Sequence, residues 1–358
     1  MMEFIPHSRP TLGEEEAEAV FKVVLSGQIT QGPQVTEFER ELAAHVGVGY
    51  GVAVSSGTAA LALALRALGV GEGDEVAVPS YACAALIHAV RFVGALPLPV
   101  DVDPRTGNLD PEDLGRRLGG RTRAIILVHM FGSPAQVEEV GRFGVPILED
   151  CAMALGAKYK GRPVGSFGRA SVFSFYATKM LATGEGGMVL TDDPDLAEAV
   201  RDFREYDMKE ELLPRFNFKM TDIQAALGRV QLGKLDAFVE RRKKIASLYD
   251  VAFRDLEAEL PPKVEDAEPS YYRYVLRVGS DSEEVVEALR TRGIGAARPV
   301  FRPIHRYLGL PPGNFPGTED IYRRAVSIPI YPSLGDGEVE RVIEGVRDVI
   351  GDGGSLGV

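Results

Sequence analysis

The stretch GVAVSSGTAALALALRAL, residues 51–68, decides how the chain is expected to fold. Residues 51–55 form a short apolar run typical of a buried strand, and residues 59–68 are Ala and Leu with almost no polar face, as in a buried helix. Between the two runs lie small residues that favour a helix start: Ser56, Gly57 and Thr58. A buried strand that leads directly into a buried helix is the repeating unit of parallel α/β sheets.

The same alternation continues along the chain in both directions. Further strands are predicted at residues 75–79, 96–100, 122–128, 146–149, 170–175 and 187–191. Further helices are predicted at residues 12–26, 35–45, 84–93, 137–143 and 194–206. We therefore expect an α/β fold whose large domain contains a mostly parallel sheet covered by helices.

A second, smaller domain is expected after the alternation ends. Residues 221–256 have long helical periodicity, and we place the domain junction inside this segment. Strand-like and helical runs follow at residues 271–278, 282–292 and 325–329, and a Pro-rich stretch, residues 299–316, is predicted to be a loop. The predicted organisation is a large domain over residues 1–240 and a small α+β domain over residues 241–358.

Bulk composition narrows the class of protein. Of the 358 residues, 45% are hydrophobic and 26% charged, and the net charge is −12. This is the composition of a soluble globular protein. The acidic balance argues against a nucleic-acid-binding protein with a broad basic face. No apolar run approaches the roughly 20 residues of a membrane span, so we expect no membrane partner.

Cysteine and histidine usage argues against disulfides and metals. Cys83 and Cys151 form neither a disulfide framework nor metal-finger spacing, which fits a reducing compartment and predicts a cytoplasmic protein. The histidines show no ligand spacing, so no metal site is expected. Only His129, after a predicted buried strand, and His305, in the Pro-rich loop, are candidate pocket residues.

The Ser56–Thr58 turn is the first candidate functional element. Hydroxyls and a glycine at a helix start expose backbone N–H groups to an anion, and the helix dipole favours negative charge there. The turn could therefore hold a phosphate group. The same residues also form an ordinary N-cap, and the local sequence leaves both readings open.

Glu149 and Asp150 are the second candidate element, because they end a predicted buried strand. Ligands of open parallel sheets bind at the carboxyl edge of the strands, so Asp150 is expected to face a ligand. An acid at this place suits the pyridine nitrogen of pyridoxal phosphate (PLP), which must stay protonated for the ring to accept electrons. A solvated acid or a helix cap is the alternative reading.

Lys179, in the segment SFYATK of residues 174–179, is the third candidate element. It directly follows a strand-like run and precedes LATGEGG (181–187), whose small residues let a ligand approach the backbone. Lysine forms Schiff bases with carbonyl cofactors when its amine is neutral. Ser174 could add a phosphate contact. The alternative is a surface lysine, the usual fate of this residue.

Taken together, these elements resemble the DegT/DnrJ/EryC1/StrS family of PLP-dependent sugar aminotransferases, with the type I (aspartate aminotransferase-like) fold. The similarity runs from about residue 9 to 349 and is carried by motifs in family order. The motifs are SGTAALALALRALGVGEGDEV (56–76), DVDPRTGNLD (101–110), ILEDCAMALGAKYKGRPVGSFG (147–168), FSFYATKMLATGEGGMV (173–189), FNFKMTDIQAALGRVQL (216–232) and RPVFRPIH (298–305).

The resemblance implies roles for individual residues. It assigns Lys179 to the Schiff base and Asp150 to the pyridine nitrogen. It assigns the phosphate to Ser56, Gly57, Thr58 and Ser174. Asn217 matches an asparagine that reaches the phosphate of the neighbouring subunit, which implies a homodimer with shared active sites. Nothing in the local sequence of Asn217 by itself indicates a ligand.

Two positions depart from the family pattern. Many members have a glutamine three residues after the aspartate, where this chain has Met153. Many have an aromatic residue stacked on the cofactor ring, where this chain has Cys83, with Tyr81 just before it. Both residues are expected to contact PLP. A related branch of sugar dehydratases replaces the lysine with histidine, and Lys179 argues against that branch.

The expected reaction transfers an amino group from L-glutamate to a keto-sugar, most simply one carried on UDP or dTDP. Candidate substrate residues are Tyr81, His129, Lys219, Arg302 and His305. One alternative is an aminotransferase of the same fold that acts on another ketone, such as a cyclitol. A second is a non-catalytic regulator, against which the retained Lys179 and Asp150 argue. A dinucleotide-dependent oxidoreductase is disfavoured because the Gly-rich run 47–51 precedes a strand instead of following one.

Overall fold

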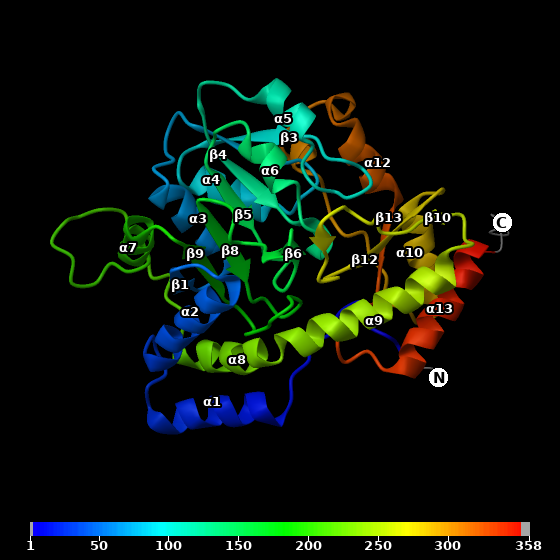
Figure 1. The fold of residues 1–358 in the computed structure, drawn as a ribbon, viewed down its shortest axis with the longest axis horizontal. Helices are drawn as coiled ribbons and strands as arrows, with labels where there is room; N and C mark the ends of the chain where they lie inside the picture. Colours follow the sequence, from blue (N-terminus) through cyan, green and yellow to red (C-terminus); the bar gives the residue numbers. More distant parts are fainter. Residues whose placement is uncertain (1–2, 352–358) are drawn as a thin grey trace.

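The structure is a computed structural model that describes residues 3–351, and the outer ends of the two predicted domains lie outside these residues. Its centre is a seven-stranded sheet in the order β1-β9-β8-β5-β4-β2-β3 (Figure 1). The strands are β1 (Tyr50–Val54), β2 (Glu75–Pro79), β3 (Leu96–Val100), β4 (Thr122–Val128), β5 (Ile147–Asp150), β8 (Ala170–Ser174) and β9 (Gly187–Thr191). Only β9 runs antiparallel to its neighbours in this sheet, so the predicted mostly parallel sheet is confirmed.

Helices cover both faces of this sheet, and the alternation of side chains along each strand explains why. In β1, Val52 and Val54 belong to one apolar cluster while Ala53 belongs to another, because successive residues point to opposite faces. The first face carries α3 (Gly57–Ala67), α4 (Ala85–Phe92) and α7 (Pro194–Phe203). The second carries α2 (Pro33–Val46), α5 (Pro111–Arg117), α6 (Val137–Gly141) and α8 (Asp222–Gly233). Helix α1 (Glu14–Ser26) lies outside against α8 (Figure 1).

The long helical segment is two helices in sequence, α8 and α9 (Leu235–Phe253). They meet at Lys234, which ends α8 and begins α9, and α9 carries the chain away from the large sheet (Figure 1). Beyond it stands a three-stranded antiparallel sheet, β10 (Ala258–Glu259), β12 (Tyr274–Val278) and β13 (Ala325–Ile328). Packed with it are α10 (Ser282–Thr291), α12 (Pro316–Arg324) and α13 (Asp336–Gly351).

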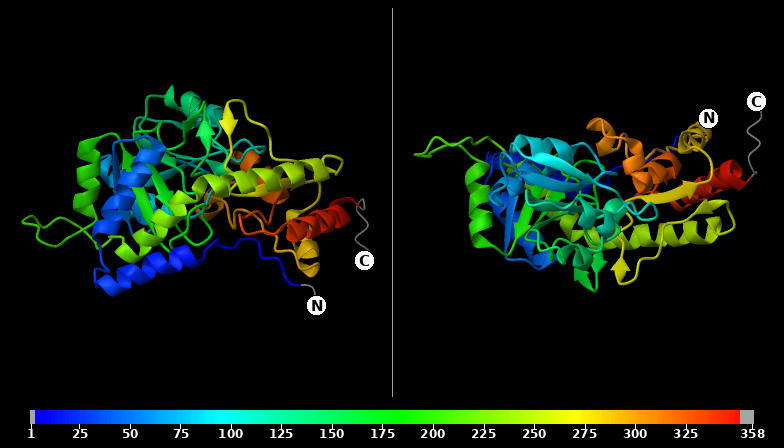
Figure 2. Two further views of the ribbon diagram at one scale, coloured as in Figure 1. Left: turned by 60° about the horizontal axis from the view of Figure 1, so that its bottom comes forward. Right: turned by 90° about the horizontal axis from the view of Figure 1, so that it is seen from above.

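The second core also takes up the beginning of the chain. Ile5 is buried in the cluster built by α9, β12 and α13, and it bridges to Ile294. From the sequence we assigned this segment to the large domain, because so short an apolar segment has no periodicity that would show which core it packs against. Figure 2 shows the extended segment before α1 running beside the small domain, and α1 itself lying on the large domain.

Short elements connect these two cores. A third sheet joins β6 (Lys158–Tyr159), β7 (Arg162–Pro163) and β11 (Ala267–Glu268), so the chain before β12 is tied to the large domain. The Pro-rich stretch predicted as a loop contains α11 (Ile304–Tyr307) and the 3-10 turn η2 (Pro312–Asn314), and a further turn η1 (Met130–Gly132) follows β4. Among the helices described, none has the length and apolar character that crossing a membrane requires.

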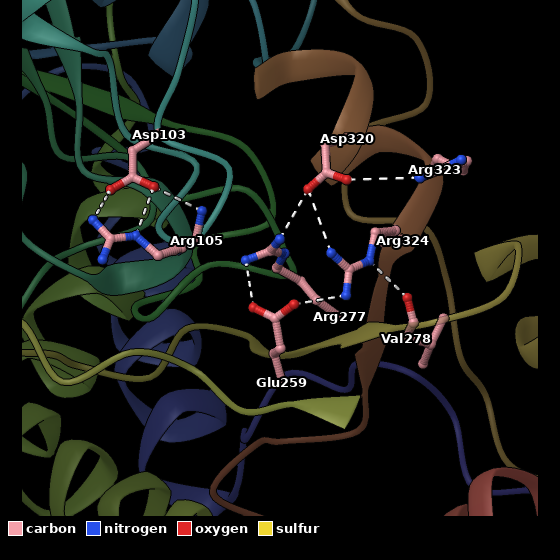
Figure 3. A network of polar contacts seen from close by, with 8 residues as sticks. All are labelled: Asp103, Arg105, Glu259, Arg277, Val278, Asp320, Arg323 and Arg324. Atoms are coloured by element: carbon pink, nitrogen blue, oxygen red, sulfur yellow. Dashed lines mark hydrogen bonds and ion pairs between the residues drawn. The ribbon is translucent and has the colours of Figure 1, made fainter. Parts of the chain in front are cut away.

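The small domain is held together by charge as well as by apolar packing. Arg277 of β12 donates to Glu259 of β10 and to Asp320 of α12, both at 2.8 Å (Figure 3). Arg324, at the end of α12, pairs with the same two acids, and Asp103 of the large domain pairs with Arg105 beside them (Figure 3). This network therefore fixes two strands and one helix next to the domain boundary.

Candidate active site

The candidate site lies at the carboxyl edge of the large sheet. Asp150 is the last residue of β5, and β8, its parallel neighbour, ends at Ser174, a few residues before Lys179. Asp150 is buried with 5% exposure, and its carboxylate accepts a hydrogen bond from the Ala152 N–H at 2.9 Å. Burial raises the pKa of Asp150, and the Ala152 N–H and Lys179 oppose that rise. The two predicted catalytic residues thus influence each other electrostatically.

The Lys179 amine has no acidic partner in the described chain. Its Nζ lies 5.1 Å from the ring centroid of Tyr272, and no hydrogen bond or ion pair joins it to any residue among 3–351. The Lys179 N–H donates to the Tyr176 carbonyl at 2.8 Å, which closes a turn after β8. An unpaired amine beside a buried acid is what a carbonyl cofactor needs for covalent attachment.

The Ser56–Thr58 turn is packed directly against Ser174. The Ser56 hydroxyl caps α3 by accepting a hydrogen bond from the Ala59 N–H at 3.1 Å. A Cβ atom on Gly57 would lie only 2.7 Å from Ser174 Cβ, so no larger residue fits there without displacement. Ser56 is therefore the N-cap of α3. The turn also brings the backbone N–H groups of the first turn of α3 beside the Ser174 hydroxyl, an arrangement that can bind an anion. Thr58 is exposed in that first turn.

Cys83 and Met153 lie near this constellation. Cys83 is exposed at the end of the segment that follows β2. Loss of water around the sulfur raises the pKa of the Cys83 thiol, the charge of Asp150 raises it further, and the charge of Lys179 lowers it. Cys83 is therefore close enough to both residues to interact with them electrostatically. Met153 is half-buried and packs against the apolar clusters on both faces of the sheet.

His129 is adjacent to Asp150, because its backbone N–H donates to the Asp150 carbonyl at 3.2 Å. The ring is fully buried, the Ala135 N–H donates to Nδ1 at 3.0 Å, and Nε2 therefore carries the proton and donates to Glu149 at 3.0 Å. Glu149 also accepts hydrogen bonds from the N–H groups of Gly165, Phe167 and Gly168. Burial would raise the pKa of Glu149, but His129 and these amides lower it on balance. Both ring nitrogens of His129 are engaged, so neither is left for a substrate.

The same residues form a grouping of metal-ligand type. One ligand atom each from His129, Glu149 and Cys151 lie within 4.8 Å of one another. The His129 nitrogens and the Glu149 oxygens already have hydrogen-bond partners, so the geometry is that of a satisfied buried polar cluster.

The remaining substrate candidates are distributed around the sheet edge. His305 is buried, with Nδ1 bonded to Ser80 at 2.7 Å and Nε2 to Glu319 at 2.8 Å, so its ring nitrogens are also engaged. Arg302 is exposed and donates to the Arg306 carbonyl at 3.0 Å. Tyr81 is fully buried, and its ring packs edge-on against Phe131 with centroids 6.2 Å apart.

Two candidates come from the segment between α7 and α8. Asn217 is exposed, and its side chain accepts only a long bond of 3.4 Å from the Lys219 N–H. Lys219 pairs with Glu205 at 2.9 Å. Neither residue is placed beside Lys179 by any contact in this chain. The middle of this segment projects from the body of the molecule (Figures 1 and 2), and its end returns to the large domain, where the Phe218 carbonyl accepts a hydrogen bond from the Ser55 N–H at 2.7 Å and Lys219 bridges to Val54.

The residues that meet at the sheet edge fit PLP. Asp150 offers a buried carboxylate for a protonated ring nitrogen, and Lys179 offers an unpaired amine. Gly57, which has no side chain and packs against Ser174, leaves the backbone of this turn open to a phosphate group. These three features occupy one edge of one sheet, which is where ligands of such sheets bind.

Comparisons with known proteins agree with a site of this kind. The family model described as the DegT/DnrJ/EryC1/StrS aminotransferase family matches residues 10–347. The chain belongs to this family. It is a PLP-dependent aminotransferase with the type I fold, as the sequence motifs predicted.

Individual members of the DegT/DnrJ/EryC1/StrS family align over almost the whole chain. The spore coat polysaccharide biosynthesis protein SpsC of Bacillus subtilis is 37% identical over 378 residues, covering 97% of each chain. The PLP form of the putative sugar aminotransferase Spr1654 from Streptococcus pneumoniae has a TM-score of 0.91 and 30% identity, covering 97% of this chain and 98% of that one. DesV of S. venezuelae, solved with a ketimine intermediate, has a TM-score of 0.88 and 36% identity, covering 96% and 98%.

Sequence reasoning missed the aromatic residue that touches the Lys179 amine. Tyr272 lies just before β12, inside a segment predicted as a strand, where an aromatic residue is normally core. Burial would raise its pKa, but Lys179, Arg273, Thr178 and Arg242 lower it to about 8. No signal in the sequence joins residues so far apart along the chain.

Proposed function

We propose that this protein transfers the amino group of L-glutamate to a keto-sugar carried on a nucleoside diphosphate such as UDP or dTDP. The observation that carries the proposal is the convergence of Asp150, Lys179 and the Gly57–Ser174 turn at one sheet edge. Support for a sugar acceptor comes from relatives, since SpsC is described as a polysaccharide biosynthesis protein and Spr1654 as a putative sugar aminotransferase.

Each residue has a defined task in this proposal. PLP, when bound, supplies an electron sink that stabilises negative charge on the donor's Cα. Asp150 keeps the ring nitrogen protonated through its buried carboxylate. Lys179 holds the cofactor, and its amine, once released, moves the proton between the donor Cα and the C4′ carbon as base and then acid. Ser56, Gly57, Thr58 and Ser174 bind the phosphate.

The proposal includes a homodimer in which Asn217 of one protomer reaches the cofactor phosphate of its partner. Asn217 is exposed at the end of the segment between α7 and α8, and the same segment exposes Met208, Leu212 and Phe216. Exposed apolar side chains grouped on one segment are typical of a surface that another protein covers. The large and small domains are proposed to meet near the α8–α9 junction, so that the site lies between them.

A visible absorption spectrum tests the proposed function directly. The purified protein should show the yellow band of lysine-bound PLP, and L-glutamate should bleach it as the amino group moves to the cofactor. Lys179→Ala should abolish turnover. A band that glutamate leaves unchanged would exclude glutamate as the donor. A protein that shows no band even with added PLP would favour the regulator over the enzyme.

A keto-sugar screen then tests the acceptor. Protein in the aminated-cofactor form is mixed with UDP- and dTDP-linked keto-sugars, and return of the yellow band marks a true acceptor. Free cyclitol ketones serve as the comparison, because a band that returns only with them would refute the nucleotide-sugar proposal.

A further inference from the structure

Tyr272 is a buried tyrosine whose ring lies against the Lys179 amine. The residue is 5% exposed, and Lys179 Nζ lies 5.1 Å from the ring centroid. The Tyr272 hydroxyl lies 3.3 Å from Thr178 Oγ1, and it accepts a hydrogen bond from the Arg273 guanidinium, also at 3.3 Å. Because Thr178 directly precedes Lys179, the hydroxyl end of the ring is directed toward the turn that carries the amine.

Three basic side chains act on the Tyr272 hydroxyl. Lys179 belongs to the turn after β8, Arg273 to the segment before β12, and Arg242 to α9. Burial by itself would raise the pKa of the Tyr272 phenol, but Lys179, Arg273, the Thr178 hydroxyl and Arg242 lower it to about 8. Tyr272 is therefore a stronger hydrogen-bond donor than an ordinary tyrosine, because its surroundings favour release of the phenolic proton.

The order of the strands in the large sheet places Tyr272 and Ser174 on opposite sides of Asp150. Ser174 ends β8, Asp150 ends β5, and η1 follows β4, and these three strands adjoin in the order β8-β5-β4. The backbone next to Tyr272 is bound to η1, because the Arg273 N–H donates to the Phe131 carbonyl at 3.1 Å. Tyr272 is therefore held on the β4 side of Asp150, and Ser174 lies on the β8 side.

The covalent structure of PLP has the same order of groups. The ring carbon that carries the lysine-reactive aldehyde lies opposite the ring nitrogen, with the phosphate arm on one side of it and the ring hydroxyl on the other. With the nitrogen at Asp150 and the phosphate at Ser174, the ring hydroxyl is expected on the β4 side, where Tyr272 lies. Met153, which is also expected to contact PLP, carries a thioether that cannot donate a hydrogen bond.

We propose that the Tyr272 hydroxyl donates a hydrogen bond to the ring oxygen of PLP and thereby sets how tightly the link between Lys179 and the cofactor holds its proton. The ionised ring oxygen attracts that proton, and a hydrogen bond from Tyr272 stabilises the oxygen and weakens the attraction. This inference rests on the proposed function, because it requires Lys179 to hold PLP. The sequence did not indicate Tyr272 for this role.

The test compares Tyr272→Phe, which removes only the hydroxyl, with wild type and with Tyr271→Phe. The visible band of lysine-bound PLP moves when the link loses its proton, so the spectrum is recorded as a function of pH. We expect the pH midpoint of this change to rise by about one to two units in Tyr272→Phe, as the loss of one charge-assisted hydrogen bond predicts. Tyr271→Phe is the matched control, because the Tyr271 side chain packs against the small-domain core instead, and its midpoint should equal that of wild type.

A binding measurement gives a second result that does not depend on turnover. Titration of cofactor-free protein with PLP should show an affinity about 10-fold lower for Tyr272→Phe than for wild type. An unchanged pH midpoint in Tyr272→Phe, or an equal rise in Tyr271→Phe, would overturn the inference, because the hydroxyl would then serve packing alone. A wild type that shows no visible band even with added PLP would instead refute the proposed function, and with it this inference, so the two failures are distinct.

Discussion

Asp150 shows how a single residue is placed for chemistry at a cost in stability. Its carboxylate is buried at the end of β5, has one hydrogen bond from the Ala152 N–H, and burial raises its pKa. Before the cofactor binds, the ionised form is therefore disfavoured in the folded protein. A protonated ring nitrogen would compensate that charge, so cofactor binding and the ionisation of Asp150 should favour each other.

Asp150→Asn should separate the two effects. For an acid with a raised pKa in the folded state, the stabilising contribution is present below the unfolded pKa of about 3.9 and is lost as pH rises through the folded pKa. Asparagine mimics the neutral form, so the cofactor-free variant should unfold at a higher temperature than wild type near pH 7, by a margin that shrinks toward acidic pH. Its kcat should fall on the order of 100-fold, because the ring nitrogen loses its anionic partner. A cofactor-free variant less stable than wild type at neutral pH would contradict this account.

At the scale of residues, the sequence indicated the site residues that lie at the ends of strands. It did not indicate the residues that reach the site through contacts between distant parts of the chain. Asp150 and Ser174 end parallel strands, and their place at one edge follows from the βα alternation alone. His129 also follows a strand, yet its ring turns inward because buried Glu149 and the Ala135 N–H satisfy it. Strand position does not determine which way such a side chain turns, and Tyr272 reaches Lys179 only through the packing of the two domains.

At the scale of elements, the junction of α3 and β8 shapes the phosphate site. The Gly57 position has no room for a side chain because Ser174 Cβ lies where its Cβ would be. Gly187 of β9 is equally close, since a Cβ there would lie 2.4 Å from the Ser56 carbonyl oxygen. Two glycines on two elements thus allow the start of α3 to sit directly on the sheet.

Gly57→Ala should push α3 away from β8. Overpacking of this kind typically costs about 1–3 kcal/mol, and we expect PLP affinity to fall about 10-fold or more as the turn moves. Titration of cofactor-free protein with PLP, followed by the visible band, measures this. Gly71→Ala is the matched control because no atom lies within 4 Å of its Cβ position, and it should bind PLP as wild type does. Equal affinities for both variants would show that the turn does not hold the phosphate.

The arginine network of Figure 3 gives a second test at this scale. The Arg277 side chain is 9% exposed and joins Glu259 to Asp320, so Arg277→Met should destabilise the protein by about 1–3 kcal/mol by leaving both acids without that partner. Arg323→Met removes an arginine that is 66% exposed and 3.8 Å from Asp320, and it should change stability by less than about 0.5 kcal/mol. Thermal unfolding of the two variants side by side measures the difference. Equal unfolding midpoints for the two variants would mean that the Arg277 ion pairs do not stabilise the fold.

Most elements of the large sheet were predictable because each strand is one apolar run between turn residues. The helical periodicity of residues 221–256 contains both α8 and α9, and it did not locate the break between them, which the geometry at Lys234 shows. No helix was predicted for α12, which begins at Pro316, the last residue of the expected Pro-rich loop. Proline suits the first turn of a helix as well as a loop, so composition alone does not distinguish the two.

At the scale of the whole molecule, several large apolar side chains are exposed on helix α1 and on the segment between α7 and α8. Phe21 and Leu25 of α1 are 60% and 70% exposed, and Met208 and Leu212 in the projecting segment are fully exposed. Asn217 follows in the same segment, where its side chain accepts a hydrogen bond from the Lys219 N–H at 3.4 Å, and its neighbour Phe218 accepts one from the Ser55 N–H at 2.7 Å. The homodimer proposed above would account for the exposure of Asn217 and of these apolar side chains.

Mixing an inactive variant with one that binds PLP weakly tests whether the active site is shared. Asn217→Ala should weaken PLP binding about 10-fold, as the loss of one phosphate contact predicts, and Lys179→Ala should be inactive. In a mixed dimer, the Asn217→Ala protomer keeps its own Lys179 and receives Asn217 from the Lys179→Ala partner, so one of the two sites is complete. With random reassociation of an isologous dimer, about a quarter of wild-type activity should return at limiting PLP, where Asn217→Ala alone is weak. If Asn217 served its own protomer, no mixed dimer would contain a complete site, and the mixture would show only the average of its two parents.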